Sequence, residues 1–112
     1  MTGAVFDKAT GVPSITPEQY NNLKSLFFEI GGVTYELNAN AQIWPRALNT
    51  HIGGQQESIY LVLFDLGTRS LSSGTLDFII GMTALQRIYS VFDTTNARVG
   101  LAKTKFTDAN IN

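Results

Sequence analysis

Cysteine is absent from the 112 residues of this chain, and histidine occurs once, as His51. Without thiols the chain cannot form disulfides, use a cysteine nucleophile or build a cysteine-based zinc site. One histidine among scattered carboxylates gives no metal-ligand spacing. The sequence therefore predicts neither a metal site nor a cofactor.

Charge is also scarce: charged residues make up 15% of the sequence and the net charge is −1. The eight lysines and arginines are scattered, so the chain lacks the basic surface that nucleic acids and anionic membranes bind. No apolar run approaches the length of a membrane span. Because 44% of the residues are hydrophobic, we expect one globular domain over residues 1–112 with its own core.

The first half of the chain predicts a short helix and a β-hairpin. Residues 1–13, rich in small residues, are expected to be irregular. Thr16, Pro17 and Gln19 then form the capping-box pattern of a helix start. Two apolar runs, residues 26–30 and 33–37, flank a Gly-Gly pair that can take positive φ, which is typical of a hairpin.

The middle of the chain is less regular. Residues 38–54 predict loop, with a short helical turn near Trp44 and Pro45. Residues 58–64 are apolar at both alternating positions, which predicts a strand covered on both faces. Residues 68–74 predict a surface loop.

The last third predicts a strand, a helical turn and a second hairpin. The strand is expected at residues 76–80 and the helical turn at residues 82–87. Residues 88–92 and 98–102 are expected to pair around Asn96, which tolerates the left-handed conformation. The predicted fold is mainly β with two or three short helices.

Single residues that could carry chemistry have plainer interpretations beside the functional ones. His51 lies in a loop-like segment without the context of a nucleophilic triad, which favours a surface histidine. Trp44 is either a semi-buried packing residue or an aromatic binding platform, and its apolar neighbours favour packing. The paired glycines lack any phosphate-loop pattern and are interpreted as turn residues.

Several short motifs together resemble pepsin-like aspartic proteases, and the basidiomycete fungal branch in particular. They are SLFF at 25–28, IGG at 30–32, YEL at 35–37, AQIWP at 41–45, FIIG at 78–81, IYSVFD at 88–93 and NARVGLA at 96–102. The resemblance covers nearly the whole chain. It implies a partial C-terminal lobe of the pepsin-like β-barrel fold over residues 14–112, and a secreted fungal protein.

The family places one catalytic aspartate in each lobe, inside a D-[ST]-G triplet, and this chain has no such triplet. Its five aspartates stand in other contexts: Asp7, Asp65, Asp77, Asp93 and Asp108. Asp7 alone follows a strand-like run, but the resemblance places that run beyond the catalytic triplet. We therefore predict no catalytic residue and no protease activity for this chain on its own.

By the same resemblance, Phe64, Leu66 and Ile79 fall where the lobe lines the substrate cleft. The alternative for these three residues is an ordinary core strand. Both interpretations are open at this stage.

Three functional hypotheses follow from the sequence. The first is a stand-alone non-catalytic protein that acts by binding another protein or host cells, an immunomodulatory role included. The second is a fragment or subunit of an acid endopeptidase that needs an N-terminal partner. The third, a retroviral-type homodimeric protease, is opposed by the missing triplet. Because a partial lobe leaves apolar faces uncovered, self-association, for example as a homodimer, is also expected.

Overall fold

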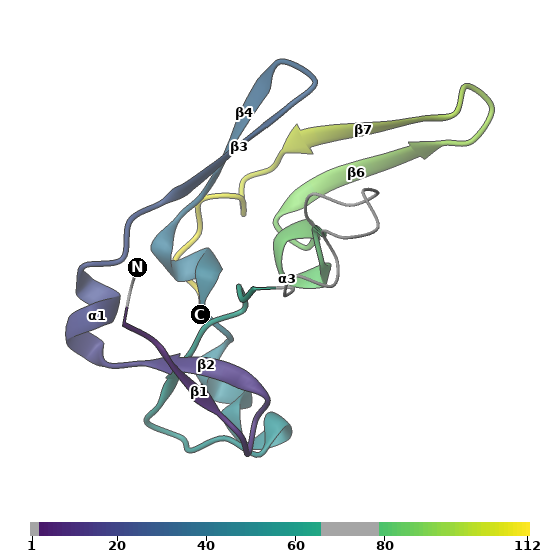
Figure 1. Cartoon of the computed structure of the whole chain (residues 1–112). Helices are drawn as coiled ribbons and strands as arrows, with labels where there is room; N and C mark the ends of the chain where they lie inside the picture. The colour runs from purple at the N-terminus through teal and green to yellow at the C-terminus, as the bar shows by residue number, and fades with distance from the viewer. Residues whose placement is uncertain (1–2, 66–78) are drawn as a thin grey trace.

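The computed structural model describes residues 3–65 and 79–112 of the chain (Figure 1). Strands dominate, and the helical segments are short, so the predicted mainly β fold is confirmed. In chain order the elements are β1 (Val5–Asp7), β2 (Val12–Ile15), α1 (Pro17–Asn21), β3 (Leu26–Ile30), β4 (Val33–Leu37), η1 (Ala39–Gln42), η2 (Arg46–Ile52), β5 (Ile59–Tyr60), α3 (Met82–Leu85), β6 (Ile88–Asp93) and β7 (Arg98–Lys103).

The first sheet has the order β1-β2-β5 and is antiparallel throughout. Val5 pairs with Ser14, and Ser14 in turn pairs with Tyr60, far along the chain. The prediction that residues 1–13 are irregular is wrong for β1 and for the start of β2. The physical reason is that β2 gains a partner strand 45 residues away, which a local pattern does not reveal.

Helix α1 begins as the sequence predicts. The Thr16 hydroxyl accepts a hydrogen bond from the Gln19 amide at 3.2 Å, and the Gln19 side chain accepts one from the Thr16 amide at 2.8 Å. These two bonds satisfy donors that a helix start leaves free. The Gln19 side-chain amide nitrogen also donates to the Gly3 carbonyl at 3.1 Å, which connects the start of the described chain to the helix.

The hydrophobic core lies where the first sheet meets the segment after η1. Four buried residues form it: Ile15, Ile43, Ile59 and Leu61. Ile43 joins the sheet through an isolated bridge to Leu61, and the Trp44 amide donates to the Tyr60 carbonyl at 2.8 Å. Tyr60 packs so closely on Gly54 that a Cβ there would lie 2.6 Å from its ring. A larger residue at position 54 would clash with the Tyr60 ring, so this position requires glycine.

Residues 38–54 contain more helix than expected. Two 3-10 helices, η1 and η2, occupy most of a segment predicted as loop, although η2 does begin directly after Pro45. The Asn38 side chain caps η1 by accepting from the Ala41 amide at 2.8 Å. Asparagine is therefore used here as a helix cap rather than as a turn residue.

The strand predicted at residues 58–64 is shorter than expected, because only Ile59 and Tyr60 are in β5. Among the described residues, no strand pairs with residues 62–64, which follow the bridge at Leu61. The Phe64 side chain is 60% exposed. The prediction of a strand covered on both faces is therefore wrong at its end. Most of the strand predicted at residues 76–80 and all of the loop at 68–74 lie outside the described residues, and Ile79 and Ile80 are not in a strand.

Both predicted hairpins are present. β3 pairs with β4 across Gly31 and Gly32, and both glycines have positive φ as the pattern requires. β6 pairs with β7 over six residue pairs, preceded by the predicted helical turn, α3. In the connection between β6 and β7, Ala97 rather than Asn96 takes the left-handed conformation (φ 50°). Asn96 instead bonds to Asp93, which explains the difference.

A hydrogen bond connects the two hairpins through β4 and β7. The Tyr35 hydroxyl of β4 donates to the Leu101 carbonyl of β7 at 2.9 Å, and Tyr35 is buried. Figure 1 shows the hairpins extending away from the first sheet. Within the described ranges, no helix is both long enough and apolar enough to cross a membrane.

Candidate functional site

The aspartates were the first candidates for chemistry, and the structure places Asp7 in a turn. Its carboxylate accepts a hydrogen bond from the Ala9 amide at 2.8 Å, and its carbonyl accepts one from the Gly11 amide at 2.8 Å. Both bonds close the β1–β2 connection, which is a common use of aspartate. Asp7 therefore has a local structural role in this chain.

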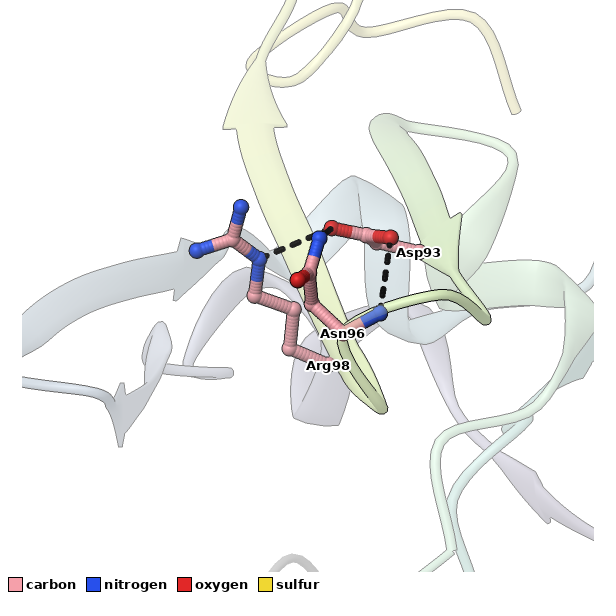
Figure 2. A network of polar contacts seen from close by, with 3 residues as sticks. All are labelled: Asp93, Asn96 and Arg98. Carbon is pink, nitrogen blue, oxygen red and sulfur yellow. Dashed lines mark hydrogen bonds and ion pairs between the residues drawn. The ribbon is translucent and has the colours of Figure 1, made fainter.

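Asp93 has the most perturbed carboxylate among the described residues (Figure 2). It accepts from the Asn96 amide at 3.2 Å, from the Asn96 side chain at 2.8 Å and from Arg98 Nε at 2.9 Å. The hydrogen bonds from Asn96, and then that from Arg98, lower the pKa of Asp93. A carboxylate held ionised by its own turn stabilises the β6–β7 connection and is a poor proton donor.

This arrangement predicts the direction of two effects on the pKa of Asp93. Because the Asn96 and Arg98 side chains both donate to the ionised carboxylate, Asn96→Ala and Arg98→Ala should each raise the pKa of Asp93. An NMR titration of the Asp93 carboxyl in the two variants measures this directly. An unchanged or lowered pKa in either variant would contradict the geometry. Since the folded-state pKa is lowered, the stabilisation by this turn should be present at neutral pH and be lost as the pH falls through that pKa.

The remaining aspartates that the structure describes form no catalytic pair. Asp65 and Asp108 are exposed, and Asp77 lies outside the described residues. Over residues 3–65 and 79–112 no group of three acidic or histidine side chains could hold a metal ion. His51 is exposed in η2, as the plain interpretation of it predicts, and Trp44 is half-buried, as expected for a packing residue.

Two of the three residues proposed to line a substrate cleft, Phe64 and Ile79, do not form a core strand. Phe64 is 60% exposed and Ile79 is 63% exposed, and neither lies in a strand. Leu66 lies outside the described residues. The core-strand interpretation is therefore wrong for Phe64 and Ile79 in this chain, while their place in a cleft stays a prediction.

A shallow polar hollow of about 420 Å³ lies between η2 and the segment before β5. It is lined by Arg46, Ala47, Thr50, Gln56 and Glu57. None of these residues was a sequence candidate, and none belongs to the predicted cleft. The lining lacks the apolar walls typical of small-molecule sites.

The residue that sequence reasoning missed is Arg87, which is only 2% exposed. Its guanidinium donates to the Ala109 carbonyl at 2.6 Å and to the Asn40 side chain at 3.1 Å. Burial lowers the pKa of Arg87, against the opposing effect of the Asp108 carboxylate. A single arginine within the apolar stretch before β6 is the sequence feature that could have identified it.

Comparison with known proteins identifies the family. Residues 2–104 match the eukaryotic aspartyl protease family. Polyporopepsin from Irpex lacteus is 61% identical over 111 residues, which are 99% of this chain and 32% of that protein. The crystal structure of the aspartic proteinase from Irpex lacteus superposes with a TM-score of 0.91 and 60% identity, over 99% of this chain and 32% of that one. The chain thus spans about a third of the length of these relatives, and it belongs to the eukaryotic aspartyl protease family.

Proposed function

We propose that this chain on its own is not a protease and acts by binding another protein through the exposed faces of the β6–β7 hairpin. The observation that carries the proposal is that this hairpin is apolar and exposed on both faces. Tyr89 and Val91 lie on one face, at 64% and 48% exposure. Phe92 and Val99 form a cross-strand pair on the other, at 67% and 59%.

Strands that are apolar on both faces are typical of sheets covered on both sides. Within the described residues, β6 and β7 form a two-stranded sheet with no third strand. Such a ladder is marginal by itself in water, and its open edges can accept another strand. These two properties favour a protein partner over a small ligand.

The size of the surface supports the same proposal. A folded monomer of this mass is expected to expose about 6100 Å², whereas the chain exposes 8146 Å². Its radius of gyration is 15.5 Å, against about 13 Å for a compact domain of this length. The surplus of about 2000 Å² on this one chain exceeds the roughly 800 Å² that each partner buries in a standard protein interface.

The partner can be a second copy of the chain, or a different protein. Binding to host-cell proteins, with an immunomodulatory effect, is one form of this proposal, and secretion belongs to it as well. A second candidate function is favoured by the 61% identity to a protein about three times as long. In that case the chain is a piece of an acid endopeptidase that gains activity with an N-terminal partner, and Phe64, Leu66 and Ile79 face its substrate cleft.

An acid-pH peptidase assay, with and without pepstatin, separates these functions. The chain alone should show no pepstatin-sensitive cleavage. Adding the N-terminal two-thirds of polyporopepsin should restore cleavage only under the second candidate function. Cleavage by the chain alone would overturn both.

Sedimentation velocity tests the binding surface. The chain should self-associate at high concentration, or form a complex with its partner, and Val99→Asp should weaken that association because it places a charge on the apolar face. Val5→Asp is the matched control, since Val5 is 69% exposed on β1, away from the hairpin. A strictly monomeric chain without a partner, or equal effects of the two variants, would contradict the proposal.

A further inference from the structure

Within residues 3–65 and 79–112, the buried hydrophobic residues all lie in the first of these two ranges. The buried hydrophobic residues among those described are Ile15, Tyr35, Leu37, Ala41, Ile43, Ile59, Tyr60 and Leu61. In residues 79–112 the buried residues are instead polar, namely Arg87 and Thr107. The two parts of the chain are therefore stabilised differently.

Residues 79–112 are joined to residues 38–46 by hydrogen bonds centred on Asn40. We call this set of contacts the clasp, and its side chains are those of Asn38, Asn40, Arg46, Arg87 and Asn112. The Asn40 side-chain oxygen accepts from Arg87 Nη2 at 3.1 Å, from the Ile111 amide at 3.0 Å and from the Asn112 amide at 3.1 Å. Its amide nitrogen donates to the Asn112 carbonyl at 3.1 Å. One buried side chain thus joins three segments.

Asn112 completes the clasp from the other side. Its side-chain amide donates to the Asn40 carbonyl and to the Ile43 carbonyl, each at 3.0 Å. Its own carbonyl also accepts from Arg46 at 3.2 Å. Asn38 adds a bond to the Asp108 carbonyl at 3.2 Å. The last residues of the chain are therefore attached to residues 38–46 by several hydrogen bonds.

One hydrogen-bond donor of the clasp lacks an acceptor among the described residues. Arg87 Nε is buried and has no hydrogen-bond partner among the described residues. A buried cation whose donors are not all paired is costly, since only paired charges recover the loss of hydration. Hydrogen bonds of this kind contribute little net free energy each, compared with buried apolar area.

We propose that residues 79–112 open as a unit separate from residues 12–61, and that the clasp on Asn40 controls this opening. Regions with few buried apolar contacts open at lower free energy than the core. The first sheet retains its own core when the clasp opens, because the four residues of the core cluster all precede residue 62. Opening would uncover the inner side of β7 and the segment around η1.

Hydrogen–deuterium exchange on the full chain tests this. Asn112→Ala removes two donors of the clasp and should speed exchange of the β6 and β7 amides by about tenfold. The amides of Trp44 and Leu61, which bond within the first unit, should be unaffected. Asn110→Ala is the matched control, because Asn110 is exposed in the same tail.

A second variant protects the test against local effects at residue 112. Asn40→Ala removes both the acceptor for Arg87 and the donor to the Asn112 carbonyl. Its β6 and β7 amides should likewise exchange faster than those of Trp44 and Leu61. Equal acceleration of all amides would mean one cooperative unit and would overturn the proposal. Unchanged exchange in Asn112→Ala, or no protected amide anywhere in the parent chain, would also overturn it.

Discussion

Arg87→Met should lower the free energy of unfolding by about 2 to 3 kcal/mol. The guanidinium donates to the Ala109 carbonyl and to Asn40, and methionine fills similar space without donating. The change leaves the part-buried Ala109 carbonyl without this donor, and it removes one of three donors to the Asn40 side-chain oxygen. A bond from a charged donor is worth more than a neutral one. Removing a buried cation offsets part of this loss, which keeps the expected effect below the sum of the bonds.

Urea denaturation of the parent chain, Arg87→Met and Arg98→Met measures this effect. Arg98→Met is the matched control, since the Arg98 side chain is 73% exposed and forms its ion pair at the surface. Its effect should stay within about 0.5 kcal/mol. If Arg87→Met were as stable as the parent chain or more so, the cost of burying the cation would exceed the value of its bonds, and the clasp could not be a stabilising contact.

The features predicted correctly from the sequence are local ones. The capping box at Thr16 and the Gly31-Gly32 turn are set by residues within a few positions of each other, and both are present. Glycine tolerates the positive φ that this turn requires, so the pattern specifies the geometry directly. The motifs that resemble pepsin-like proteases identified the family for a related reason, since they are contiguous strings.

The features that were missed are contacts between distant segments. β2 pairs with β5 across 45 residues, and Arg87 reaches Asn40 across 47. Neither segment contains a local sign of its partner, so residues 1–13 were predicted to be irregular and Arg87 was not singled out. Contacts of high sequence separation depend on the whole fold, which a single sequence specifies only in aggregate.

The candidate site likewise has some features that the local sequence predicts and others that depend on distant segments. The missing D-[ST]-G triplet is a local fact of the sequence, and the structure gives Asp7 and Asp93 turn roles. The exposure of Phe64 and Ile79 was not predictable, because an apolar strand pattern is the same whether or not a partner covers it.

Ile43→Ala should destabilise the chain by about 3 kcal/mol. Ile43 is 1% exposed, packs in the core cluster and bridges to Leu61 of the first sheet. Its truncation removes buried methyl and methylene groups and leaves a cavity that the bridged backbone cannot easily close. Because Ile43 also lies within residues 38–46, which hold the clasp, its loss should weaken both units at once.

Ile79→Ala deletes the same atoms from a side chain that is 63% exposed, and it should change the stability by less than about 0.5 kcal/mol. Thermal or urea unfolding compares the two variants, and hydrogen exchange locates the effect. In Ile43→Ala the amides of Leu61 and of β6 and β7 should all exchange faster, unlike in Asn112→Ala, where only the hairpin is affected. A small effect of Ile43→Ala, or a large effect of Ile79→Ala, would contradict the assignment of the stabilising core to the cluster around Ile43.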